Sequence, residues 1–108
     1  MNTRIPLFAS WTLATLLSAQ QAAAAPSSAD LRLQALAATC ANCHGTQGRA
    51  IEGSAVPGLA GLPASYLADQ MRAFKQGSRP ATVMHQLAKG YTDAQIDALA
   101  GYFATRPR

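Results

Sequence analysis

The fold is decided by a stretch of five residues, Cys40-Ala41-Asn42-Cys43-His44, which has the pattern C-x-x-C-H. This pattern is the attachment sequence for c-type haem. On a helix, side chains three and four positions apart lie on the same side. Two thiols at this spacing can each add to one haem vinyl group, and the imidazole of His44 can reach the iron. The motif therefore predicts one covalently bound haem c per chain, with His44 as the proximal iron ligand.

A pair of cysteines at this spacing has other uses as well. A thioredoxin-like redox pair needs strands on both sides of the motif, and no part of this sequence alternates with the period of a strand. A zinc site needs a fourth ligand besides the motif, usually from a second paired cluster, and only His85 is left to supply it. A plain structural disulfide is a third possibility. Haem attachment is favoured, and a thiol–disulfide enzyme stays open as an alternative function.

The size and charge of the chain narrow the function further. The chain has 108 residues and a formal net charge of +4, without a run of basic residues. Haem propionates would offset about two of these charges, so we do not expect a nucleic-acid partner. A domain this small buries little apolar surface and often needs a disulfide, a metal or a cofactor to be stable. A covalent haem meets that need.

The first 24 residues have the features of a secretory signal peptide. A basic start at residues 1–4 precedes an apolar stretch at residues 5–17 and an alanine run at residues 22–25. We expect cleavage after Ala24, which leaves a mono-haem domain of residues 25–108 in the periplasm. An uncleaved membrane anchor is the alternative, but the apolar stretch is shorter than the roughly 20 residues that span a bilayer. No permanent membrane anchor is therefore expected.

The remainder of the chain has a helical pattern, which predicts an all-α domain. Ser27 and Asp30 have the spacing of a capping box, so a first helix begins there, continues through the haem motif and stops at Gly45. Residues 45–62 form a long glycine-rich loop, and such a loop in a small domain is expected to wrap something.

Three further helices are expected after this loop. A second helix starts with Pro63 at its first position and ends at Gly77, with its inner face formed by Leu67, Met71 and Phe74. A short helix covers residues 83–89 and stops at Gly90. The last helix begins with a capping box of Thr92 and Gln95 and ends before Pro107.

The second axial ligand of the iron has three candidates, Met71, Met84 and His85. Met71 lies in the middle of an amphipathic helix, where a core role is expected. Met84 follows an extended segment that could present a thioether to the far side of the haem, and methionine sulfur suits iron that cycles between two oxidation states. His85 is adjacent and could compete. The sequence favours Met84.

The order of these features resembles that of class I cytochromes c. Two stretches, LAATCANCHGT at residues 36–46 and RPATVMHQLAKGY at residues 79–91, are similar to one branch of the family. This branch contains the cytochrome subunit of flavocytochrome c sulfide dehydrogenase and related small periplasmic cytochromes. The chain differs from the two-haem members of the branch in having a single C-x-x-C-H motif.

The resemblance implies a set of roles around the haem. His44 is the proximal ligand and Met84 the distal ligand. The carbonyl of Pro57 accepts a hydrogen bond from the second ring nitrogen of His44 and so fixes the ring. Tyr66 and Arg79 could reach the haem propionates, and the alternatives are a half-buried helix tyrosine and a solvated arginine.

The resemblance also implies a fold and a function. In the class I cytochrome c fold, the first and last helices cross around the haem, which would bring together Leu33, Leu36, Ala37, Leu99, Ala100 and Phe103. The expected function is periplasmic electron transfer from a flavoprotein sulfide dehydrogenase partner to a downstream carrier, without enzymatic activity of its own. A surface that meets such partners would include Arg72, Lys75 and Lys89. Two alternatives stay open: a free-standing small cytochrome c that donates electrons to an oxidase, and a haem sensor or peroxidase with an open iron site.

Overall fold

The computed structural model describes Met1 and residues 24–108 of the chain, and the predicted signal peptide lies outside this part except for its two ends. The described part is helical and contains no strand. Its elements, in chain order, are α1 (Ser28–His44), η1 (Thr46–Gly48), α2 (Ala64–Gln76), α3 (Met84–Leu87), η2 (Ala88–Gly90) and α4 (Asp93–Ala104). The expected all-α architecture is confirmed.

Helix α1 begins and ends as its sequence predicts. The backbone N–H of Asp30 donates to the Ser27 hydroxyl over 3.1 Å, and the Asp30 carboxylate accepts from the Ser27 backbone N–H over 3.1 Å. This capping box satisfies two donors that a helix start leaves without partners. The helix then runs through the haem motif and stops at Gly45, whose φ is 84°.

Helix α4 begins with the second predicted capping box. The Gln95 N–H donates to the Thr92 hydroxyl over 3.1 Å, and the Thr92 N–H donates to the Gln95 side chain over 2.9 Å. Four of its side chains, Ile96, Leu99, Ala100 and Phe103, are buried. Their spacing gives α4 one apolar face toward the centre of the domain.

Helix α2 starts one residue later than predicted. Pro63 is the cap residue and has an extended conformation, with φ −56° and ψ 135°, so the prediction that it takes the first helical position is wrong. Its carbonyl already accepts the first helical hydrogen bond, from the Leu67 N–H over 3.1 Å. The helix ends at Gly77 in the left-handed conformation, as predicted.

The short helix expected at residues 83–89 is present in two pieces. Helix α3 makes a single turn, and the tighter 3-10 turn η2 follows and ends at Gly90. Both pieces pack on α2. The segment that carries Met84 therefore rests on α2.

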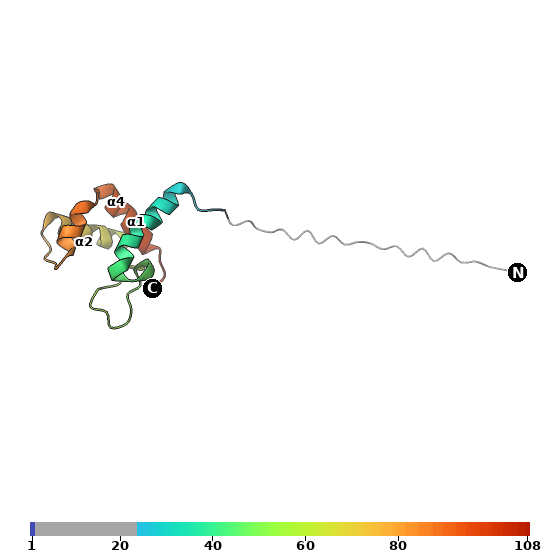
Figure 1. Ribbon diagram of the computed structural model, residues 1–108, viewed down its shortest axis with the longest axis horizontal. Helices are drawn as coiled ribbons and strands as arrows, with labels where there is room; N and C mark the ends of the chain where they lie inside the picture. The colour runs from blue at the N-terminus through green and yellow to red at the C-terminus, as the bar shows by residue number, and fades with distance from the viewer. Residues whose placement is uncertain (2–23) are drawn as a thin grey trace.

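The core lies where α1, α2 and α4 meet, and α1 crosses α4 as Figure 1 shows. This crossing confirms the predicted arrangement of the first and last helices. Leu36 packs against the core from its edge, whereas Leu33 lines a groove on the outside of the crossing, beside Ala98 and Gly101. The buried core side chains are Ala37, Leu67, Ala68, Ile96, Leu99, Ala100 and Phe103.

Two ion pairs join α2 to α4 across the surface. The Arg72 guanidinium contacts the Asp97 carboxylate, and Lys75 Nζ lies 2.8 Å from Asp93 Oδ1. Exposed pairs of this kind contribute little stability, but they neutralise the charges involved. Two of the three basic residues expected to meet a partner are therefore already paired within the chain.

None of the described helices is both long enough and apolar enough to cross a bilayer.

Candidate haem-binding site

The last turn of α1 carries the predicted haem motif. Cys40 is partly buried, Cys43 is exposed, and His44 is buried. Neither cysteine forms a disulfide in the described part of the chain. Both thiols are therefore available for thioether bonds, and the two cysteines and His44 share one end of a single helix.

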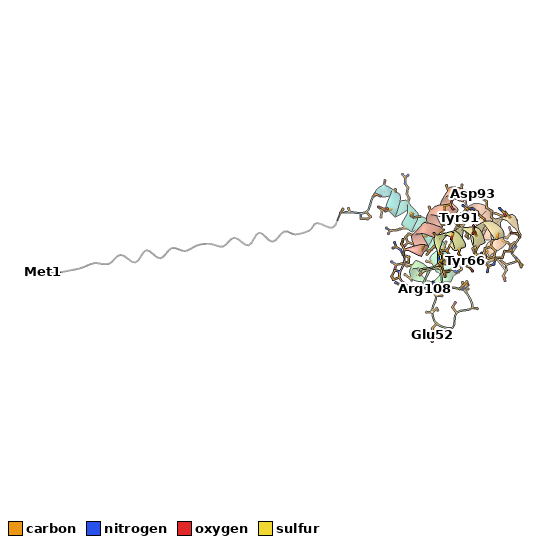
Figure 2. All side chains as sticks on the ribbon, turned by 180° about the vertical axis from the view of Figure 1, so that it is seen from behind. Met1, Glu52, Tyr66, Tyr91, Asp93 and Arg108 are labelled. Carbon is orange, nitrogen blue, oxygen red and sulfur yellow. The ribbon has the colours of Figure 1, made fainter. Side chains whose placement is uncertain are left out.

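Gly45 lets the chain turn away directly after His44. Its φ of 84° is a conformation that side chains with a Cβ rarely adopt, and a Cβ there would lie 2.0 Å from the backbone oxygen of Arg49. The loop that follows can therefore fold back close to the end of α1. Its outer part projects from the helices, as Figure 2 shows for Glu52.

The His44 ring is oriented by this returning loop. Its Nδ1 lies 2.6 Å from the carbonyl oxygen of Pro57. A carbonyl oxygen can only accept a hydrogen bond, so Nδ1 carries the ring proton. Nε2 then has the lone pair that a metal ion needs, and the ring is fixed in the tautomer of an iron ligand.

Main-chain hydrogen bonds keep Pro57 in place. The carbonyl of Gly48 accepts from the N–H groups of Leu59 and Ala60, over 2.7 and 3.0 Å, and so closes the base of the loop. The N–H of Gly61 donates to the carbonyl of Phe103 at the end of α4, over 3.0 Å. The histidine side of the site is thus held by backbone groups.

The surroundings of Cys40 differ from those of Cys43. Burial raises the pKa of the Cys40 thiol, and the polar Thr39 and Tyr91 hydroxyls beside it oppose this rise. Cys40 faces the partly buried layer next to the core, whereas Cys43 lies at the exposed edge. Two available thiols and an oriented imidazole are the donor set that a covalent haem requires, so the residues present fit this group.

The three candidates for the second iron ligand lie in different places. Met71 packs against the core from α2, in agreement with its predicted core role. Met84 is the first residue of α3 and is partly buried. His85 is also partly buried, and its Nδ1 is buried without a hydrogen-bond partner in the described structure.

The two residues expected at the propionates lie on or beside α2. Tyr66 is in the first turn of α2 and is 47% exposed. The Arg79 guanidinium lies 4.6 Å from the centre of the Phe74 ring and donates a hydrogen bond to the Gln70 side chain. Part of the Arg79 hydrogen-bonding capacity is therefore used within the chain, although a guanidinium has five N–H donors.

A contact between Thr39 and Tyr91 is absent from the sequence-based predictions. Their hydroxyl oxygens are 2.8 Å apart and join α1 to the residue that follows η2. Tyr91 precedes the Thr92 cap, a position where an apolar side chain often packs back on the new helix, so its burial could have been predicted. Its hydroxyl partner lies 52 positions away in the sequence, and no local pattern indicates such a pairing.

Similarity to known proteins identifies the family of this chain. The family model for cytochrome c matches residues 33–106. The chain belongs to the cytochrome c family. The predicted fold class and the predicted haem c cofactor are confirmed, and the chain is a small c-type cytochrome of the electron-transfer class.

Individual relatives include two proteins that are named after a thiosulfate dehydrogenase and a sulfide dehydrogenase. The chain is 47% identical over 68 residues to the thiosulfate dehydrogenase electron acceptor of Thiomonas intermedia, covering 63% of this chain and 31% of that protein. It is 42% identical over 72 residues to the cytochrome subunit of sulfide dehydrogenase of Chlorobaculum tepidum, covering 67% and 64%. It is 34% identical over 71 residues to cytochrome c-554(548) of Halomonas halodenitrificans, covering 63% and 84%. The chain thus spans about a third of the Thiomonas protein and 64% of the Chlorobaculum protein.

Proposed function

We propose that this chain carries electrons in the periplasm, from a flavin-containing enzyme that oxidises sulfide to a downstream carrier. The support comes from two relatives whose names connect them to dehydrogenases of reduced sulfur compounds. Since the chain covers only part of each of these proteins, the donor and the direction of transfer are inferred and belong to the proposal. The haem supplies one-electron redox chemistry, and the protein supplies its ligands and surroundings.

The observation that carries the proposal is the 2.6 Å contact between His44 Nδ1 and the Pro57 carbonyl, at the end of the helix with both thiols. We assign thioether bonds to Cys40 and Cys43, proximal ligation to His44 Nε2 and distal ligation to Met84. An iron held by these two protein ligands would have no open position. Such a site favours outer-sphere electron transfer over substrate chemistry at the metal.

Tyr66 and Arg79 complete the proposed site at the propionates. The exposed position of Tyr66 leaves its hydroxyl accessible, and Arg79 has further N–H donors beyond the one on Gln70. Residues 1–24 are proposed as the cleaved signal peptide that delivers residues 25–108 to the periplasm.

The first experiment tests the haem and its ligands. The chain is produced in a bacterial host with haem-attachment machinery, and mass spectrometry should show one haem of added mass on residues 25–108. Ferric protein should show the weak far-red charge-transfer band of methionine-ligated haem. The Met84→Ala variant should lose this band and bind carbon monoxide when reduced, whereas His85→Ala should keep the band.

Other outcomes favour the other functions. A polypeptide of unmodified mass with an active dithiol points to a thiol–disulfide enzyme. Wild-type protein that binds carbon monoxide at neutral pH points to a sensor or peroxidase with an open iron site.

The second experiment tests the donor. Sulfide, the flavin-containing subunit of a sulfide dehydrogenase and the ferric holoprotein are mixed without oxygen, and haem reduction is followed by absorbance. Reduction that requires the flavoprotein supports the proposal. Reduction by thiosulfate with a thiosulfate dehydrogenase, but not by the sulfide system, replaces the proposed donor.

A free-standing carrier is the second candidate. The observation in its favour is the match to cytochrome c-554(548), because the matched domain accounts for 84% of that protein. Size-exclusion chromatography of holoprotein mixed with the flavoprotein distinguishes a permanent subunit from a free carrier. A stable complex supports the subunit, and separate elution with retained electron transfer supports the free carrier.

A further inference from the structure

Tyr91 joins two parts of the proposed site that are far apart in the sequence. It caps the 3-10 turn η2, which continues directly from the helix that Met84 begins. Its hydroxyl oxygen lies 2.8 Å from the Thr39 hydroxyl oxygen on α1. Thr39 is the residue directly before Cys40, so the contact ends beside the first haem-bonding thiol.

The direction of this hydrogen bond follows from the second contact of Thr39. Its hydroxyl donates to the carbonyl oxygen of Leu36 over 2.7 Å, and a hydroxyl has one proton to give. The Tyr91 hydroxyl must therefore be the donor, and Thr39 accepts. Tyr91 therefore donates to Thr39, and Thr39 donates to the Leu36 carbonyl in the backbone of α1.

The Tyr91 ring is fixed independently of its hydroxyl. It is partly buried and packs against the core cluster formed by α1, α2 and α4. Replacing Tyr91 by Phe therefore keeps the packing of the ring and removes a single hydrogen bond. Both α3 and η2 pack on α2, so the Tyr91–Thr39 hydrogen bond adds a direct link from the Met84 segment to the helix with Cys40 and His44.

We propose that Tyr91 is a positioning residue that holds the Met84 segment against α1 and thereby keeps the methionine sulfur on the iron. The inference rests on the proposed function, because it takes Met84 as the distal ligand. A soft thioether is a poor match for ferric iron, so the bond is weakest in the oxidised state and a small change in positioning becomes measurable there. The loss of one neutral hydrogen bond changes such an equilibrium by about fivefold to tenfold.

The test measures how easily an added ligand replaces the methionine. Imidazole is titrated into ferric holoprotein at fixed pH, and loss of the far-red band reports displacement of Met84. Tyr91→Phe should bind imidazole about fivefold to tenfold more tightly than wild type. Its reduction potential should also fall, because methionine ligation favours the reduced iron.

Matched variants separate positioning from general loss of stability. Tyr102 is another partly buried tyrosine that packs on the same core, so Tyr102→Phe removes the same atom elsewhere and should change imidazole affinity less than about twofold. Thr39→Val removes the acceptor and should match Tyr91→Phe, whereas Thr39→Ser keeps a hydroxyl and should behave as wild type. Adding Thr39→Val to Tyr91→Phe should change the affinity no further.

Each failure has its own signature. If wild type shows the far-red band and Met84→Ala loses it, but Tyr91→Phe and Thr39→Val bind imidazole as wild type does, the role of Tyr91 is wrong and the ligand assignment stands. If wild type lacks the band, or Met84→Ala keeps it, the ligand assignment fails and the Tyr91 proposal fails with it. Equal effects of Tyr91→Phe and Tyr102→Phe also overturn the role of Tyr91.

Discussion

The two sides of the proposed haem site are built by different means. On the His44 side, the loop of residues 45–62 is fixed by main-chain groups: the Pro57 carbonyl holds the imidazole, and the Gly48 carbonyl closes the base of the loop. On the Met84 side, α3 and η2 are short turns whose hydrogen bonds are mostly local, such as those from the N–H groups of Gln86 and Leu87 to the Val83 carbonyl. Contacts from this side to the long helices come from side chains, with Arg79 on Phe74 of α2 and Tyr91 on Thr39 of α1.

This difference indicates which substitutions will affect each of the two proposed iron ligands. Backbone groups cannot be removed by ordinary substitution, so the histidine side is sensitive mainly at glycines that let the chain come close. Side-chain contacts can be removed singly, so the methionine side can be adjusted in small steps without loss of the fold. We therefore expect large effects on stability from the first side and graded effects on ligand strength from the second.

The largest effect is expected from Gly45→Ala on the histidine side. Alanine at this position would have to adopt a positive φ, and its Cβ would lie 2.0 Å from the Arg49 backbone oxygen. Strain and collision together should lower the free energy of unfolding by more than about 3 kcal/mol and sharply reduce holoprotein yield. Urea unfolding followed by circular dichroism, with haem absorbance for yield, measures both.

Gly53→Ala is the matched control for this substitution. Gly53 also has a positive φ, 77°, but no atom lies within 4 Å of the Cβ position. Gly53→Ala should therefore lower the free energy of unfolding by about 1 kcal/mol, which is the cost of a positive φ alone. Equal stability of the two variants would show that the close return of the loop after His44 does not occur.

A smaller effect is expected from Arg79→Gln on the methionine side. The substitution removes the guanidinium from the Phe74 ring, 4.6 Å away, and should cost about 0.5–1 kcal/mol in urea unfolding. If Arg79 also reaches a propionate, the reduction potential should fall, because a nearby cation favours the less positive reduced iron. Arg32→Gln, at an exposed position on α1, should leave both quantities unchanged.

The helices could be predicted because their signals are local. Both capping boxes lie within four residues of sequence, and the apolar spacing of α4 is complete in one element. The haem motif is also local, since Cys40, Cys43 and His44 lie within five consecutive residues at the end of one helix. Pro63 lies one position before its predicted place in α2. A proline has no N–H to donate, so it fits both the cap position and the first helical position.

The polar side-chain contacts between elements could not be predicted from local sequence patterns. The partners of Arg72 and Lys75 lie 25 and 18 positions away, and the partner of Tyr91 lies 52 positions away. Their formation depends on how α1, α2 and α4 pack, and spacing within one helix contains no information on that. The position of Pro57 was anticipated through the family resemblance, because no rule of local structure connects a loop carbonyl to a histidine on the preceding helix.

The smallest effect is expected at the ion pair that supports α2, on which the Met84 segment rests. Lys75, by hydrogen bond and charge, lowers the pKa of Asp93 below its ordinary value of 3.8. A carboxyl whose pKa is lower in the folded state adds stability above its unfolded pKa, and this stability is lost as the pH falls through the folded pKa. Wild-type stability should therefore decline as the pH falls below about 4, and Asp93→Asn should decline less steeply in thermal unfolding at low salt. Glu52→Gln, at the outer tip of the loop (Figure 2), should decline as wild type does, and a steeper decline for Asp93→Asn would contradict the ion pair's role.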